Sequence, residues 1–225
     1  MKRNSFVYSV TKQIARFVFF ICYKIEIESE KEVVLPDQGP AVILPKHQYW
    51  TDIPIVSFAF QPLLYFVAKR ELFNYLPIRK YLHLLGGIPV DRKESIKSLD
   101  SFKSIFSLLK AGEKIVIFPE GTYFRGEVGP GKSRLLQMIL KLQVELKHKI
   151  PFFPVGIHYG ERKGWRRRVE VCIGSPLFAE EESDAISLTE RAMKEISHLC
   201  QLPRQSSEFG VQSSENKDKM LRTPN

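Results

Sequence analysis

Short apolar runs alternate along this chain with segments whose apolar residues recur every three or four positions. Five runs are apolar at nearly every position, which is typical of buried strands: 41–44, 63–68, 114–118, 152–157 and 169–173. Alternation at 24–28 is typical of a half-exposed strand. The periodic segments predict amphipathic helices over 53–60, 99–109, 135–146 and 183–200. This order predicts an α/β fold with a mostly parallel central sheet flanked by helices.

The first 24 residues differ in character from the rest. They contain no acidic residue, and the apolar run at 17–23 is shorter than the ~20 residues that a bilayer span requires. No small-residue cleavage site of a signal peptide follows it. We expect residues 1–24 to form an amphipathic, membrane-associating helix, with an ordinary buried helix as the alternative. The residues expected to contact lipid there are Phe6, Arg16, Phe17 and Phe20.

A chain of 225 residues is long enough for one domain with short appendages. We expect an α/β domain over residues 25–200. Residues 201–225 are polar and short of apolar side chains, and we expect them to be a disordered tail.

The chain is basic, with 34 Lys and Arg residues against 25 Asp and Glu residues. Such an excess favours an anionic partner, either lipid headgroups or nucleic acid. Because no nucleic-acid recognition motif accompanies it, we expect a membrane partner and no nucleic acid. A second basic cluster, at 162–168, surrounds Trp165, which we expect to contact lipid; a solvated loop is the alternative.

Cysteines and histidines are scattered. Cys22, Cys172 and Cys200 form no close pair, and no histidine joins a cysteine or glutamate at a zinc-binding spacing. This cysteine usage is typical of a reducing compartment. We therefore expect no bound metal.

An imidazole and a carboxylate follow the predicted strand 41–44. His47 precedes Asp52 by five positions, and Pro45 and Pro54 resist a continuous helix, so we expect a loop leading into a helix with Asp52 as its N-cap. In a loop the two side chains can meet. A carboxylate bonded to one ring nitrogen orients the ring and raises its basicity, so the other nitrogen can accept a proton. A capping Asp52 beside a surface His47 is the alternative.

Two later strand ends also have candidate binding groups. In 86–92 two glycines precede a short strand and Arg92 follows it; an arginine can grip a phosphate with two parallel hydrogen bonds. A tight turn with a surface ion pair is the alternative there. The strand 114–118 ends in Pro119, Glu120, Gly121 and Thr122, and the cations Arg125 and Lys132 follow. A carboxylate there can bond a substrate hydroxyl while the cations hold a phosphate, or it can serve as a cap or an ion-pair partner.

Four segments, in this order and spacing, resemble the four blocks of the glycerolipid acyltransferase family, whose best-known members are 1-acyl-glycerol-3-phosphate acyltransferases. The segments are His47-x4-Asp52, 87–92, 118–122 and 151–155. The resemblance extends over about residues 40–178. Four ordered blocks are far more specific than a single one.

The resemblance implies a reaction and a set of roles. His47 would be the general base, Asp52 would orient it, and Arg92, Glu120 and Gly121 would help bind the acceptor. Thr122, Arg125 and Lys132 are the further acceptor-binding candidates, from the residue types at this strand end. The enzyme would move a fatty acyl group from acyl-CoA or acyl-carrier protein to the free hydroxyl of a lysophospholipid. The expected acceptor is 1-acyl-glycerol-3-phosphate and the product phosphatidic acid. Neither a cofactor nor a metal is implied, and we expect the enzyme at the cytoplasmic face of a membrane.

One position departs from the family pattern. Family members commonly continue the third block as Gly-Thr-Arg-Ser-Arg, whereas this chain has Tyr123 in place of the first arginine. A neutral phenol does not replace a cation at a phosphate, so a lysolipid with another headgroup stays open as acceptor. Two rivals to a transferase also stay open. One is a membrane-binding relative without catalysis; the other is a hydrolase, of which the absence of Gly-x-Ser-x-Gly disfavours only the serine type.

Overall fold

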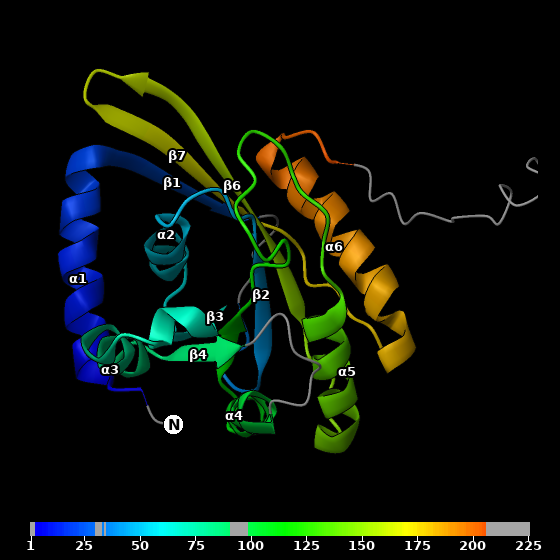
Figure 1. Ribbon diagram of the computed structural model, residues 1–225. Coiled ribbons are helices and arrows are strands. Elements are labelled where there is room, and N and C mark those ends of the chain that lie inside the picture. The colour runs from blue at the N-terminus through cyan, green and yellow to red at the C-terminus, as the bar shows by residue number, and fades with distance from the viewer. Residues whose placement is uncertain (1–2, 30–32, 34, 91–98, 206–225) are drawn as a thin grey trace, which may run out of the picture.

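A seven-stranded sheet with helices on both faces forms the centre of the protein (Figure 1). The computed structural model describes residues 3–29, 33, 35–90 and 99–205. Neighbouring strands run parallel except for one antiparallel pair, β6 and β7. The predicted α/β fold with a mostly parallel sheet is therefore confirmed. In spatial order the strands are β1 (Tyr23–Ser29), β7 (Arg166–Ile173), β6 (Phe152–Lys163), β2 (Ala41–Pro45), β5 (Lys114–Val116), β3 (Leu64–Lys69) and β4 (Gly87–Val90).

Two helical layers cover the sheet (Figure 1). One layer holds α4 (Leu99–Lys110), α5 (Arg134–Leu146) and α6 (Ala185–Cys200), and the other holds α1 (Ser5–Cys22) and α2 (Asp52–Ala59). Successive residues of a strand point to opposite faces. In β2, Val42 and Leu44 accordingly join the cluster under α4, α5 and α6, while Ala41 and Ile43 join the cluster under α1 and α2. A strand buried on both faces explains the continuous apolar run at 41–44.

The loops after β2 and β5 leave the sheet in opposite directions. From β2 the chain goes to β3, which lies beyond β5, and from β5 it goes to β6, which lies beyond β2. Open α/β sheets bind ligands at the carboxyl ends of strands where the connections diverge in this way. The predicted site residues of both loops lie at this end of the sheet.

The structure adds a helical segment that the sequence patterns do not predict. It consists of the short 3-10 helix η1 (Arg70–Phe73) and α3 (Leu76–Leu84). Their apolar residues give no clear buried face, and no residue of α3 is buried. A second short 3-10 helix, η2 (Glu182–Asp184), precedes α6.

Two predicted boundaries need correction. The strands β6 and β7 run on into a hairpin, so that the basic cluster at 162–168 lies at the hairpin tip and not in a separate loop. Of the expected disordered tail, residues 201–205 are described and pack on the domain. The backbone N–H of Val128 donates to Pro203 O (2.7 Å), and Gln205 N donates to Val128 O (2.9 Å). Residues 206–225 lie outside the described part of the chain.

Candidate active site

The loop between β2 and α2 brings His47 and Asp52 together. The Nδ1 of His47 lies 3.0 Å from Oδ2 of Asp52, which also accepts hydrogen bonds from the backbone N–H groups of Gln48 (2.5 Å) and Tyr49 (2.8 Å). Asp52 is completely buried. A buried carboxylate needs such donors, because burying an unpaired charge is strongly unfavourable. The predicted contact between the two side chains is therefore present.

The prediction that Asp52 is the N-cap of the following helix is wrong. Thr51 occupies the N-cap position, and Asp52 is the first residue of α2. Its carboxylate turns back to the amides of the preceding loop instead of accepting from the amides of the helix. The negative charge still lies in the first turn, where the helix dipole favours it.

Two aromatic rings enclose the imidazole of His47. Its ring centroid lies 3.9 Å from that of Phe118 and 4.4 Å from that of Tyr123. The His47 side chain keeps 10% of its surface exposed. With Nδ1–H donated to Asp52, the lone pair of Nε2 is the one free to accept a proton.

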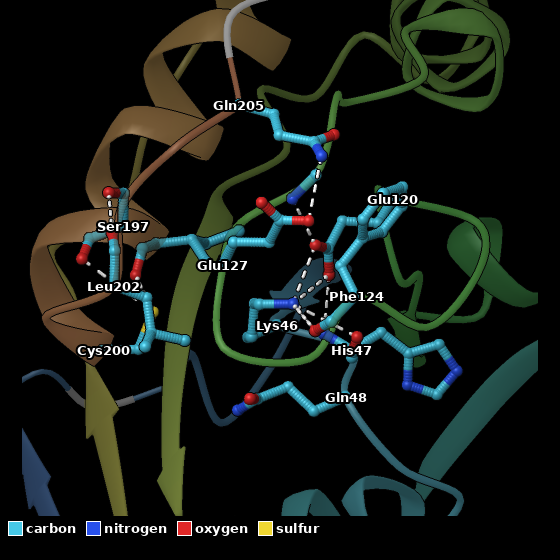
Figure 2. Close-up of polar contacts among 12 residues, drawn as sticks. Lys46, His47, Gln48, Glu120, Phe124, Glu127, Ser197, Cys200, Leu202 and Gln205 are labelled. Carbon is cyan, nitrogen blue, oxygen red and sulfur yellow. Dashed lines mark hydrogen bonds and ion pairs between the residues drawn. The ribbon is translucent and has the colours of Figure 1, made fainter.

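A buried ion pair fixes the ends of β2 and β5 to each other (Figure 2). The ammonium of Lys46 lies 2.8 Å and 3.1 Å from the two oxygens of Glu120, and it also donates to Phe124 O (2.7 Å). Glu120 further accepts from the backbone N–H groups of His47 (2.7 Å) and Gly129 (2.8 Å). Burial raises the pKa of Glu120, and Lys46 and the two backbone amides oppose that shift.

This geometry corrects the expected role of Glu120. Its side chain has no exposed surface, and both oxygens already accept hydrogen bonds from protein groups. The carboxylate thus holds the backbone of His47 in place and does not face an acceptor.

The other predicted acceptor residues of the third block lie around the exposed loop after β5. Thr122, Arg125 and Lys132 are exposed. Gly121 has a φ of 71°, and a Cβ there would lie 3.1 Å from Cδ of Lys132, so the lysine stem runs over the glycine. The guanidinium of Arg125 lies 4.9 Å from the ring centroid of Tyr49 in the β2 loop. Arg125 therefore lies against the loop 46–51 that carries His47, called the histidine loop below, whereas Lys132 lies over Gly121 in its own loop.

Arg92, the arginine predicted to bind a phosphate, lies outside the described residues.

Two residues of the site were not among the predicted ones, Lys46 and Tyr159. Lys46 could have been found from the sequence, because it directly follows a predicted buried strand and a buried cation needs an anionic partner. Tyr159 leaves none. Its hydroxyl donates to Oδ1 of Asp52 (2.6 Å) and lies 2.7 Å from the hydroxyl of Thr51. Pairing of β6 with β2 is what brings Tyr159 across 107 sequence positions to Asp52.

The α1 helix lies along one side of the domain with most of its surface exposed. Tyr8 and Phe19 are buried against the domain, and the ammonium of Lys12 donates to Phe60 O (2.8 Å). Phe6, Arg16, Phe17 and Phe20 are exposed, Phe17 to 68%. Trp165, at the hairpin tip, is 73% exposed. Among the described helices, α1 alone has the length and composition of a membrane segment.

An apolar cavity of about 260 Å³ lies between α1, α2, the strands β3 and β4, and the segment formed by η1 and α3. Ile53 and Pro54, which directly follow Asp52, form part of its wall together with Phe58, Phe66 and Leu82. The cavity therefore adjoins the helix that supplies the carboxylate of the site.

In the described part of the chain, no three His, Cys, Asp or Glu side chains gather as a metal site would require. That no metal takes part stays a prediction.

A comparison with known protein families matches residues 26–158 of the chain to a family model described as Acyltransferase. A relative from Bacillus subtilis (strain 168), named 1-acyl-sn-glycerol-3-phosphate acyltransferase, is 36% identical over 149 residues, which are 64% of this chain and 69% of that protein. A protein of the same name from Pseudomonas aeruginosa is 35% identical over 154 residues, covering 64% of this chain and 57% of that protein. The chloroplastic 1-acyl-sn-glycerol-3-phosphate acyltransferase LPAT1 of Arabidopsis thaliana is 28% identical, and the match covers 63% of this chain but 40% of the plant protein.

Among solved structures, the fold is similar to the crystal structure of the 1-acyl-sn-glycerophosphate (LPA) acyltransferase PlsC from Thermotoga maritima. The TM-score is 0.59 at 21% sequence identity, and the match covers 84% of this chain and 79% of that one. At this identity the likeness establishes the shared fold alone.

Proposed function

The chain belongs to the acyltransferase family, and on this premise we propose that it transfers a fatty acyl group from an acyl thioester to the free hydroxyl of a lysophospholipid. The proposed acceptor is 1-acyl-glycerol-3-phosphate and the proposed product phosphatidic acid, as the names of the relatives suggest. The observation that carries the proposal is the 3.0 Å contact between His47 and a buried, fully hydrogen-bonded Asp52.

The chemistry follows from that contact. Nε2 of His47 takes the proton of the acceptor hydroxyl while the alcohol oxygen attacks the thioester carbonyl carbon. Asp52 stabilises the imidazolium that forms. The tetrahedral intermediate then expels the thiolate as its C–S bond breaks, and the imidazolium gives its proton to the departing sulfur. The acyl group ends as an ester of the acceptor, and His47 returns to its neutral form without a covalent enzyme intermediate.

The exposed cations around the loop after β5 are the proposed phosphate ligands. Arg125 and Lys132 are both exposed, as binding of a phosphate from solution requires. The Arg125 guanidinium lies against Tyr49 of the histidine loop, and the Lys132 side chain lies over Gly121. Thr122 adds a hydroxyl to this rim. We assign Arg92 to the same role on the strength of the family resemblance alone.

The apolar cavity beside α2 suits the fatty acyl chain of a substrate. A fatty acyl chain needs an apolar environment, and the wall of this cavity begins one residue after Asp52. We propose that it accepts an acyl chain. The donor thioester is either acyl-CoA or acyl-carrier protein.

Membrane contact is proposed through α1 and the hairpin tip. The exposed aromatic residues Phe6, Phe17, Phe20 and Trp165 supply apolar surface, and Arg16 supplies a cation for anionic headgroups. This arrangement would give the catalytic domain access to a lysolipid in the bilayer. We propose the cytoplasmic side of the membrane, where soluble acyl thioesters are made.

Purified full-length protein, a labelled acyl thioester and lysophosphatidate test the proposal. The expected result is labelled phosphatidic acid that depends on both substrates. Release of free labelled fatty acid instead would identify a hydrolase. Absence of any turnover with both donors, in protein that binds vesicles, would identify a membrane-binding relative without catalysis.

A different lysolipid acceptor is the second candidate, and Tyr123 is the observation that favours it. Its half-exposed phenol ring packs on the imidazole of His47, at a position where a phosphate-binding arginine is common in the family. A panel of lysolipids with and without a terminal phosphate separates the two candidates. Preference for acceptors without that phosphate, reversed by Tyr123→Arg, would establish the second candidate.

A further inference from the structure

The segment formed by η1 and α3 presents apolar side chains to solvent. No residue of α3 is buried, and in η1 only Phe73 is. Monomeric soluble proteins rarely expose large contiguous apolar patches, and such patches mark interaction sites. The exposed apolar side chains of this segment are Leu72, Tyr75, Leu76, Ile78, Tyr81 and Leu84.

This segment lies beside α1 (Figure 1). The hydroxyl of Tyr81 donates to that of Thr11 (3.2 Å), and the backbone N–H of Asn4 donates to Leu84 O (3.1 Å). The exposed charges in and next to the segment are mostly positive. The one exposed acid is Glu71, and the four exposed cations are Lys69, Arg70, Arg79 and Lys80.

We propose that η1 and α3 form a second lipid-contact element, which enters the headgroup region of an anionic bilayer beside α1. Apolar and aromatic side chains bordered by cations are the composition of an interfacial membrane surface. The charges complement anionic lipid, and the hydrogen bonds to α1 hold both helices on one side of the domain. The inference rests on the proposed membrane contact of α1.

Sedimentation with vesicles of phosphatidylcholine and phosphatidylglycerol tests the inference. The double variant Leu76→Asp, Ile78→Asp should reduce vesicle partitioning by roughly tenfold or more, since two aliphatic side chains lose their transfer into lipid. Val144→Asp is the matched control, because Val144 is 64% exposed on α5, in the opposite layer. This control should partition like the wild type.

Three results of these experiments would overturn the inference, each in a different way. Unchanged partitioning of the α3 double variant, together with a loss for Phe17→Asp, would overturn the role of α3 and leave that of α1. Unchanged partitioning of both variants would overturn the membrane proposal as a whole. A wild-type dimer in sedimentation velocity that the α3 variant abolishes would assign the surface to a second copy of the chain and overturn the inference.

An independent observation concerns Tyr159. Its hydroxyl donates to Oδ1 of Asp52 at 2.6 Å, a length typical of an O–H donated to an ionised carboxylate. Because that proton goes to Asp52, the hydroxyl of Thr51 must donate to Tyr159 across the 2.7 Å contact. The phenol ring is held in place by the Tyr49 ring (4.8 Å between centroids) and by the guanidinium of Arg167 (5.2 Å from the ring centroid).

We infer that Tyr159 is a positioning residue for the proposed reaction and acts through Asp52. Oδ2 of Asp52 accepts all the bonds from the histidine loop, whereas Tyr159 is the donor to Oδ1 among the described contacts. This bond fixes the carboxylate plane and so the direction of the His47 ring. Burial raises the pKa of Tyr159, with a further contribution from Asp52, so the phenol stays protonated and able to donate.

Tyr159→Phe removes the donor and keeps the ring. We expect kcat to fall about tenfold with KM for the thioester little changed. The acidic limb of the pH profile of kcat/KM should move to higher pH, because Asp52 then keeps more of its charge for the imidazolium. Tyr23→Phe is the matched control, since it removes a hydroxyl from a ring whose centroid lies 6.4 Å from that of Tyr159. Under this inference the control leaves both kcat and the acidic limb of the pH profile unchanged.

A titration of the His47 ring by NMR, assigned with His47→Ala, gives a readout that does not need turnover. The titration midpoint should move to higher pH in Tyr159→Phe and stay in place in Tyr23→Phe. An unmoved midpoint would overturn the role of Tyr159 even if kcat fell, because general loosening of the fold would explain that fall. A moved midpoint in a protein without transferase activity would keep this inference and refute the proposed function.

Discussion

The loops that follow β2 and β5 meet at the same edge of the sheet but are built in opposite ways. The first is closed: His47 is nearly buried, and Asp52 and Lys46 are completely so, each with several hydrogen-bond partners. The second buries Glu120 and its neighbours, but beyond them the chain exposes Thr122, Arg125 and Lys132.

This difference in burial matches two different tasks: the first loop orients the general base, and the second meets the charged substrate. A general base must be held in one orientation, and burial with complete hydrogen bonding does this. Substrate charges arrive from solvent or membrane, so the groups that meet them must stay exposed. The Lys46–Glu120 pair joins the two loops, since Glu120 also accepts the backbone N–H of His47.

Asp52→Asn tests the closed loop most strongly. The amide no longer stabilises the imidazolium, so kcat should fall by about 10²–10⁴. Steady-state kinetics with the labelled thioester measure this effect. Asp37→Asn, at an exposed position, should leave kcat unchanged. A loss of less than about tenfold in Asp52→Asn would show that the closed loop is not needed to orient the base.

Lys46→Met tests whether the buried pair holds the loops together. It leaves the Glu120 carboxylate without its cation, and the free energy of unfolding should fall by about 3–5 kcal/mol. Denaturant unfolding followed by circular dichroism measures this change. Lys149→Met, which breaks the exposed pair with Glu180, should change stability little. Equal stabilities of the two variants would contradict the difference between the buried and the exposed region.

Arg125→Gln and Lys132→Gln test the open loop. Each variant should raise KM for lysophosphatidate by about fivefold and leave kcat unchanged, because exposed cations contribute modest binding energy. The effect should shrink at high salt. Lys141→Gln, at an exposed position of α5, is the control. A fall in kcat at constant KM would move these residues into the catalytic step.

The pattern of strands follows from the continuous apolar runs in the sequence. The two prolines favour a loop in which His47 and Asp52 can meet, but the sequence leaves a surface His47 open. The inward turn of Glu120 does not follow, since the same residue types suit an ion pair or an exposed binding site. Tyr159 is beyond sequence reasoning for another reason: its contact with Asp52 depends on the pairing of distant strands. The α3 helix is missed because it is short and buries no residue, so its apolar positions do not mark a core-facing helix.

Residual transfer by His47→Ala tests the central claim most directly. The protein is assayed with the labelled thioester and lysophosphatidate, and its fold is checked by circular dichroism and vesicle binding. If His47 removes the proton from the acceptor hydroxyl, turnover should fall at least about a thousandfold in a folded, vesicle-binding protein. More than about a tenth of the wild-type turnover in such a protein would contradict the assignment.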